Sequence, residues 1–267
     1  MNRTLERHFE IFFQRISLSG NQRKAALNRA EEICAFLRAE SNVSECFVSG
    51  SISRSTAVRN FSDIDIIAAM NEETPPETRP DSVVSDLLST LQIRYPQARI
   101  SENTVRISFP SGPDVDVLPA LEVSSPGVGT FSIPTFNRDA WERFIPSEQT
   151  RLVRDIDARL GGELTQLIKL VKWWSHLHEQ IIPSFRIEQI ACAVFEHEMP
   201  PMNRAVVDFF DVANQQLGNS SRIQSEKTRE AHALAAKAVE LEDRGDIQES
   251  IDHWGCLLGD QFPTVIV

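Results

Sequence analysis

The chain changes character near residue 136, and this change constrains its fold more than any other feature. Before that point, short apolar segments typical of strands alternate with helical patterns. The segments that we expect to be strands are 46–48, 63–69, 98–101, 104–109 and 115–118, and the helices among them are 3–16, 22–40 and 81–94. After that point only helical patterns occur, at 147–159, 162–179, 184–198, 202–217, 225–243 and 246–258. The pattern predicts an α+β half followed by an all-helical half.

The composition is that of an ordinary globular protein. The 267 residues are 41% hydrophobic and 24% charged, and no run of 18 apolar residues is present, so we expect no membrane-spanning helix. The first ten residues contain acids where a signal peptide needs an uninterrupted apolar stretch, so we expect a cytoplasmic protein.

The four cysteines are expected to be reduced, buried and small apolar residues. Cys34, Cys46, Cys192 and Cys256 show no C-x-x-C spacing, and no two of them lie near a histidine at the spacing of a zinc finger.

The charge distribution argues against a long nucleic acid as substrate. The chain carries 27 basic and 38 acidic side chains, a net charge of −11, and only residues 1–60 have a small basic excess. A protein that holds a duplex by its phosphates usually presents a basic face. We therefore expect no long nucleic-acid partner and no membrane partner.

The segment with the clearest chemical signature joins two apolar strands. It contains Gly50-Ser51 after the first strand and Asp63-Ile64-Asp65 at the second. Residues i and i+2 of a strand point to the same face, so Asp63 and Asp65 project together and repel each other unless a cation lies between them. Carboxylate oxygens favour Mg²⁺ or Mn²⁺. A glycine with a neighbouring hydroxyl can bring the backbone close to a phosphate.

A second pair of acids, Asp114 and Asp116, lies on a nearby predicted strand. A third carboxylate from this pair could complete a site for two metal ions, which stabilises both the attacking and the leaving oxygen in phosphoryl transfer. An alternative interpretation is that the paired acids only form a solvated strand edge.

The run G-S-I-S-R-S-T followed by S-D-I-D-I and V-D-V-L-P-A resembles the DNA polymerase β-like nucleotidyltransferase superfamily. Within it, the chain is most similar to the cGAS/DncV-like nucleotidyltransferases (CD-NTases, SMODS type) of bacteria. The helix around Lys172, the segment that begins at Pro183 and the end of the chain from Trp254 also resemble that family. The likeness spans essentially the whole chain, so we expect the chain to be complete.

The resemblance implies a fold, a division into domains and a role for single residues. It implies a polymerase β-like core, a mixed sheet with flanking helices, over 1–140, and a helical domain over 141–267 that closes the nucleotide cleft. It assigns the catalytic and metal-binding role to Asp63, Asp65 and Asp116, with two Mg²⁺ or Mn²⁺ ions, and leaves Asp114 as a competitor for the third position. It assigns nucleotide binding to Gly50, Ser51, Lys172, Ser184 and Phe185, and leaves the roles of Arg54 and Thr56 open.

Two of these assignments have simpler alternatives. Lys172 could be a solvated lysine on a helix, and Phe185 could be a packed core residue.

The implied activity is the joining of nucleoside triphosphates into a cyclic oligonucleotide with release of pyrophosphate. The product would be a second messenger in anti-phage defence, and the implied partners are ATP and other triphosphates, with regulatory or defence-operon proteins. Two alternatives stay open: transfer of nucleotides to an RNA 3′ end, as in CCA- or poly(A)-adding enzymes, and an inactive homologue that senses nucleotides.

Overall fold

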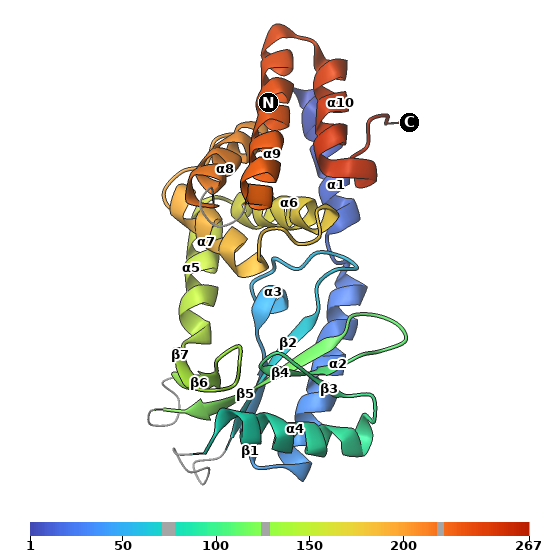
Figure 1. The fold of residues 1–267 in the computed structure, drawn as a ribbon. Coiled ribbons are helices and arrows are strands. Elements are labelled where there is room, and N and C mark those ends of the chain that lie inside the picture. The colour runs from blue at the N-terminus through green and yellow to red at the C-terminus, as the bar shows by residue number, and fades with distance from the viewer. Residues whose placement is uncertain (71–77, 124–128, 218–221, 267) are drawn as a thin grey trace. The chain divides into compact units, whose positions relative to one another are not determined.

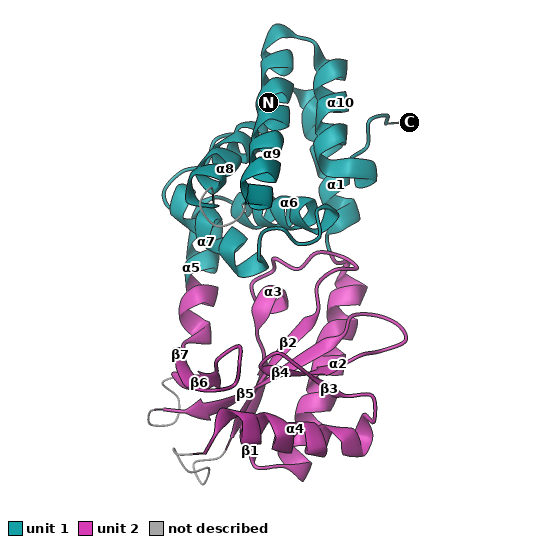
Figure 2. Ribbon diagram, in the orientation of Figure 1, with its two compact units in different colours: residues 1–17, 152–267 teal, residues 18–151 magenta. Residues whose placement is uncertain are grey.

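The computed structural model describes residues 1–70, 78–123, 129–217 and 222–266. The chain forms two compact units, one of residues 18–151 and one of residues 1–17 together with 152–267 (Figure 2). We expected a division at 140/141 with the N-terminal helix in the first domain. The difference arises because α1 (Arg3–Ile16) packs its apolar face against the C-terminal helices. Phe9 of α1 lies edge-on to Trp254, and Phe12 lies edge-on to Trp173.

The first unit is built on a mixed sheet. Its described strands are β1 (Val43–Val48), β2 (Ile64–Met70), β3 (Arg99–Ser101), β4 (Thr104–Ile107), β5 (Val115–Glu122), β6 (Phe131–Pro134) and β7 (Trp141–Phe144). The order is β1-β2-β5-β4-β3, and β6 pairs with the far end of β5 and with β7. Strands β2 and β5 are parallel, whereas the other described pairs are antiparallel. In this strand order, the parallel pair lies inside the sheet, between β1 and β4.

Two helices cover one face of this sheet, α2 (Gly20–Glu40) and α4 (Pro80–Arg94) (Figure 1). Alternate residues of the central strands point toward them: Ile64 and Ile66 of β2, and Val115 and Val117 of β5, lie in one apolar core with both helices. The residues in between point to the opposite face, because side chains alternate along a strand. Asp65 and Asp116 are among these intervening residues.

The predicted helices and main strands are confirmed, but a short helix, two short strands and the 3₁₀ helix Gly259–Gln261 are additional among the described residues. The helix α3 (Gly50–Ser53) occupies the segment expected to be a polar turn. Strands β6 and β7 were not predicted, and β7 lies inside the region that we expected to be only helical. Each has four residues, which is too short to produce a clear periodic pattern.

The helical unit contains α1 and most of the C-terminal half. The remaining elements are α5 (Pro146–Arg159), whose first residues belong to the sheet unit, α6 (Glu163–Leu177), α7 (Ser184–Val194), α8 (Met202–Leu217), α9 (Arg222–Arg244), α10 (Ile247–Leu258) and the 3₁₀ helix Gly259–Gln261. Its core is rich in aromatic side chains: Trp174 lies edge-on to Phe210, and Trp254 is fully buried.

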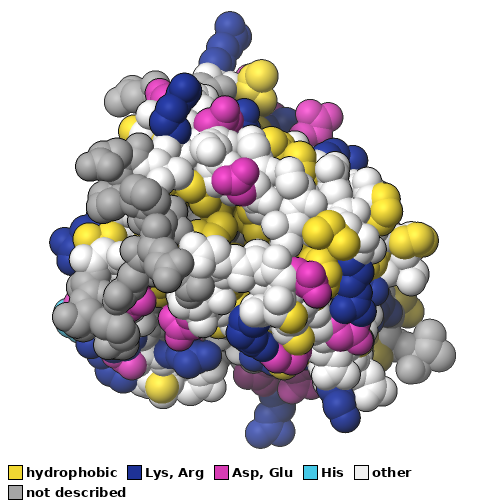
Figure 3. Space-filling view, turned by 90° about the horizontal axis from the view of Figure 1, so that it is seen from below, with side chains coloured by type: hydrophobic (Ala, Val, Ile, Leu, Met, Phe, Trp, Pro, Cys, Tyr) yellow, Lys and Arg dark blue, Asp and Glu magenta, His cyan; other side chains and the backbone are white. Residues whose placement is uncertain are grey.

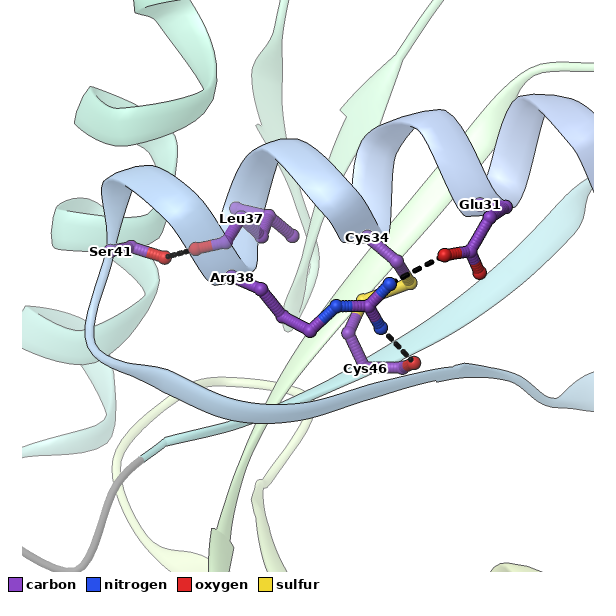
Figure 4. Close-up of a disulfide and its surroundings, with 6 residues drawn as sticks. All are labelled: Glu31, Cys34, Leu37, Arg38, Ser41 and Cys46. Carbon is purple, nitrogen blue, oxygen red and sulfur yellow. Dashed lines mark hydrogen bonds and ion pairs between the residues drawn. A yellow bond between two sulfur atoms is a disulfide. The ribbon is translucent and has the colours of Figure 1, made fainter.

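A disulfide joins Cys34 of α2 to Cys46 of β1 (Figure 4). The expectation that all four cysteines are reduced is therefore wrong for this pair. The two Cα atoms are 5.3 Å apart, within the normal range for a disulfide, because the helix packs directly on the strand. Sequence spacing alone does not reveal such a tertiary contact. Cys192 is buried as expected, whereas Cys256 is exposed.

Among the described residues, no helix is long and apolar enough to cross a membrane. On the face drawn in Figure 3, lysine and arginine side chains are interspersed with aspartate and glutamate and do not gather in one patch.

Candidate active site

The candidate acids lie where two central strands begin. Asp63 immediately precedes β2, Asp65 is the second residue of β2, and Asp116 is the second residue of β5. Asp65 and Asp116 are register partners in the parallel pair, so their side chains leave the same face of the sheet. This is the face opposite α2 and α4. The fold thus brings the acids of two separate D-x-D motifs together.

Asp114 has a different environment from Asp116. Its carboxylate accepts hydrogen bonds from the Ser108 hydroxyl at 3.0 Å and from the Phe109 N–H at 3.1 Å. These contacts tie Asp114 to the end of β4 and the turn that follows. Asp114 is thus tied to the turn, although it lies close enough to Asp63 to raise the pKa of that carboxyl. Asp116 is instead the register partner of Asp65 on the neighbouring strand.

Gly50 brings the backbone directly against one of these acids. It begins α3 with a φ of +63°, and a Cβ atom at this position would lie 1.7 Å from Oδ2 and 2.8 Å from Cβ of Asp65. The backbone N–H of Ser49 also donates to the carbonyl of Asp65 at 2.8 Å. No other residue can occupy position 50 without displacing the Asp65 side chain, because the contact includes the Cβ of that residue.

A backbone hydrogen bond closes the loop that follows Ser51. The backbone N–H of Thr56 donates to the carbonyl of Ser51 at 2.9 Å, and the Thr56 side chain is fully buried. Ser51 is partly exposed, as is Arg54. Thr56 therefore stabilises the loop, while Ser51 remains accessible.

Arg106 also belongs to this cluster, although no motif of the sequence pointed to it. Arg106 of β4 is the register partner of Asp116, and its guanidinium donates to both oxygens of that carboxylate, at 2.8 Å from Nε and 2.6 Å from Nη2. The same Nη2 donates to Asp63 at 2.7 Å. The signal was present in the sequence: a hairpin centred on Ser111 places position 106 opposite position 116.

The electrostatics of the cluster follow from burial and from this arginine. Burial raises the pKa of Asp63, and the nearby Arg106 guanidinium opposes part of that rise. Hydrogen bonding to Asp116 raises the pKa of Arg106, which stays charged. The carboxylates of Asp63, Asp114 and Asp116 all act on this one guanidinium, so the cluster keeps an excess of negative charge.

These residues fit divalent cations by their chemistry. Asp63, Asp65 and Asp116 offer hard oxygen donors, and a cationic group, the Arg106 guanidinium, already bridges two of them. As the side chains stand, no three Asp, Glu, His or Cys side chains in the described ranges converge closely enough to hold an ion.

A cavity of about 490 Å³ opens beside the acids, within the sheet unit. Asp63 and Asp114 line it, together with Gln22 and Arg29 of α2 and Phe61 of the loop before β2. The carboxylate of Asp63 is 37% exposed as a side chain, so small ligands can reach it.

The remaining candidates, Lys172, Ser184 and Phe185, lie in the helical unit. Lys172 of α6 is buried and forms an ion pair with Glu188 of α7, with 2.7 Å between Nζ and Oε1. The alternative that Lys172 is a solvated lysine is therefore wrong. Both side chains are almost completely buried, so the pair fixes α6 to α7 from the inside.

Ser184 and Phe185 are the first two residues of α7, directly after Pro183. Ser184 is exposed, and Phe185 is 55% exposed. The alternative that Phe185 is a core residue is thus also wrong, and its ring is available for stacking.

Comparison with known proteins identifies the family of this chain. A family model of the Second Messenger Oligonucleotide or Dinucleotide Synthetase (SMODS) domain matches residues 3–156, more than half of the chain. The protein belongs to this family. The resemblance to the cGAS/DncV-like nucleotidyltransferases, read from the motifs, is confirmed, and so is the α+β fold with a helical C-terminal part.

Individual relatives of this SMODS protein are distant in sequence. The cyclic AMP-AMP-AMP synthase of Escherichia coli (strain MS 115-1) is 26% identical over 147 residues, which cover 52% of this chain and 45% of that protein. The match thus spans less than half the length of that curated relative.

Two solved structures share the whole fold. The structure of Escherichia coli MS115-1 CdnC with ATP has a TM-score of 0.75 and 16% identity, and covers 96% of this chain and 98% of that one. The CD-NTase CdnG of Bradyrhizobium diazoefficiens, in complex with GTP, has a TM-score of 0.73 and 14% identity, with coverage of 96% and 95%.

Proposed function

We propose that this SMODS protein is a metal-dependent nucleotidyltransferase that joins nucleoside triphosphates into a cyclic oligonucleotide and releases pyrophosphate. The observations that support the proposal are that Asp65 and Asp116 are register partners on β2 and β5, and that Arg106 bridges Asp63 and Asp116. The second-messenger role in anti-phage defence rests on the family resemblance.

The chemistry requires an attacking hydroxyl, a triphosphate and a place for the negative charge that develops between them. Two Mg²⁺ or Mn²⁺ ions held by Asp63, Asp65 and Asp116 would supply the charge stabilisation. Of these acids, Asp116 is the one proposed to take the proton of the attacking hydroxyl. Gly50 contributes by its missing side chain, which leaves the Asp65 carboxylate packed against the backbone.

The helical unit supplies the candidates for nucleotide binding. Ser184 and Phe185 are exposed at the start of α7, where a hydroxyl can donate to a phosphate and a ring can stack on a base. Lys172 is proposed to contact the triphosphate and, through Glu188, to hold α7 in place. Relatives solved with ATP and with GTP support triphosphates as substrates.

Two other functions use the same acids. Transfer of nucleotides to an RNA 3′ end requires binding of a long, negatively charged RNA, and the net charge of −11 of this chain is unfavourable for such binding. If the protein were an inactive nucleotide sensor, there would be no physical reason for it to keep three mutually repelling carboxylates together.

The proposal is tested by incubating the full chain with all four nucleoside triphosphates and MgCl₂ or MnCl₂, with and without added RNA. Mass spectrometry should detect a cyclic oligonucleotide in both mixtures, and Asp116→Asn should abolish it. Products that appear only when RNA is added would establish the RNA-extending alternative. No incorporation under any condition would establish the inactive one.

A further inference from the structure

The guanidinium of Arg106 lies where the candidate metal site needs its cation. Its Nη2 is 2.6 Å from Oδ2 of Asp116 and 2.7 Å from Oδ2 of Asp63, and its Nε is 2.8 Å from the other oxygen of Asp116. These are the lengths of charge-assisted hydrogen bonds, and the contact with Asp116 is bidentate. The arginine therefore occupies donor atoms of two of the three carboxylates.

The surroundings strengthen this contact beyond that of a surface ion pair. The side chains of Arg106, Asp63 and Asp116 are 28%, 37% and 16% exposed. Partial burial reduces the screening of the charges by solvent. Strand pairing also positions the arginine: Arg106 and Asp116 are register partners on β4 and β5, so both side chains leave the same face.

The arrangement is set for a guanidinium and not for a metal ion. In the described parts of the chain, no three potential ligands converge closely enough to hold an ion as they stand. An ion that takes the oxygens of Asp63 and Asp116 must displace Arg106 from them, and it also meets the repulsion of a fixed positive charge.

We propose that Arg106 is an internal counter-cation that positions Asp63 and Asp116 in the metal-free protein and competes with the divalent cation for them. Arg106 is thus a positioning residue that sets the metal concentration at which the acids become available. The inference rests on the proposed metal-dependent function, but its test measures binding and stability, not activity.

A permanent structural role for Arg106 gives a different expectation. If the arginine only joined β4 to the acids, its removal would lower stability equally with and without metal. If it is displaced by metal, its removal destabilises only the metal-free protein, because the bound ion takes over the same carboxylates.

The test compares the wild type with Arg106→Gln, Arg106→Lys and Arg99→Gln. Arg99 of β3 is exposed and is the register partner of Arg106. Arg99→Gln is therefore the control, because it removes the same charge one strand away. Mn²⁺ binding to the nucleotide-free full chain is followed by the electron paramagnetic resonance of free Mn²⁺, and the melting temperature is measured without and with saturating Mn²⁺.

Arg106→Gln should bind Mn²⁺ at least about tenfold more tightly than the wild type, since a repelling charge is removed. Its melting temperature should be lower than wild type without Mn²⁺ and equal to it with saturating Mn²⁺. Arg106→Lys keeps the positive charge but loses the bidentate guanidinium, so its Mn²⁺ affinity should lie between those of the wild type and Arg106→Gln. This variant serves as the test if Arg106→Gln does not fold. Arg99→Gln should match the wild type.

An unchanged or weaker Mn²⁺ affinity in both Arg106 variants would overturn the inference. A stability deficit that persists at saturating Mn²⁺ would also overturn it, in favour of the structural role. Failure of the wild type itself to bind Mn²⁺ would refute the proposed metal site together with the inference, and this outcome is recognisable because it does not depend on any variant.

Discussion

Asp65 and Asp116 are register partners on the parallel strands β2 and β5, so that strand pairing alone places their carboxylates on one face of the sheet. A shift of either strand by one residue would turn its acid toward the apolar core under α2 and α4. The position of the acids is therefore tied to the packing of Ile64, Ile66 and Val115 on the other face.

Replacement of any one of the three acids should remove nucleotide incorporation. Asp63→Asn, Asp65→Asn and Asp116→Asn each keep the side-chain shape but remove a charge on which the proposed cation binding and transition-state stabilisation depend. Activity should fall to background, with an unchanged circular dichroism spectrum. Asp114→Asn is the control, because Asp114 bonds to Ser108 and Phe109 and should lose much less activity. Near wild-type activity at saturating Mg²⁺ in one of the three variants would remove that residue from the site.

Gly50→Ala should impair both stability and activity. The new methyl group would overlap the Asp65 carboxylate, and the positive φ adds about 1–2 kcal/mol of backbone strain for a non-glycine residue. The melting temperature should fall, and incorporation should drop to a few per cent or less. Gly20→Ala is a matched control, because nothing lies within 4 Å of its Cβ position at the start of α2. A Gly50→Ala variant as active as Gly20→Ala would show that the contact with Asp65 is unimportant.

The pair Lys172–Glu188 allows structural and substrate-binding roles to be separated. Lys172→Met should lower the free energy of unfolding by about 3–5 kcal/mol, since it removes the cation from a buried ion pair. Lys172→Met combined with Glu188→Gln should recover much of this loss in urea unfolding. We expect KM for the triphosphate to stay raised in the double variant, because a cation on the phosphates binds ground and transition states alike. A double variant with normal KM would limit Lys172 to fixing α6 against α7.

The disulfide Cys34–Cys46 should contribute to stability without contributing to the chemistry. It closes a short loop between α2 and β1, for which chain entropy predicts about 3 kcal/mol. Dithiothreitol, or Cys34→Ala with Cys46→Ala, should lower the melting temperature. Cys256→Ser at an exposed position should have no effect. An unaltered melting temperature after reduction, with two additional free thiols by mass spectrometry, would contradict this prediction.

The sequence predicted most of the fold because its helices are long and periodic. Helices such as α2 and α8 have the expected limits to within a few residues, and the strands that carry Asp65 and Asp116 were expected at their observed places. The short strands β6 and β7 have too few residues for a periodic signal and depend on pairing with β5.

What sequence could not show was contact between distant segments. The packing of α1 with the C-terminal helices depends on tertiary burial of Phe9 and Phe12, which periodicity alone does not assign to a partner. The same reason applies to Arg106, whose role depends on the register between β4 and β5, and to the burial of Lys172 against Glu188. In each case the sequence shows the type of the residue but does not show which residue it contacts in the fold.

The central claim, that one chain makes a ring from free triphosphates, is tested most directly with α-³²P-labelled ATP, the other triphosphates and Mg²⁺, without RNA. A linear product keeps a terminal triphosphate that phosphatase removes, whereas a ring has no terminal phosphate. We predict a labelled oligonucleotide whose migration phosphatase leaves unchanged, preceded in a quench series by a linear dinucleotide with a triphosphate. No labelled oligonucleotide in the absence of RNA, or only products whose migration phosphatase changes, would contradict the claim.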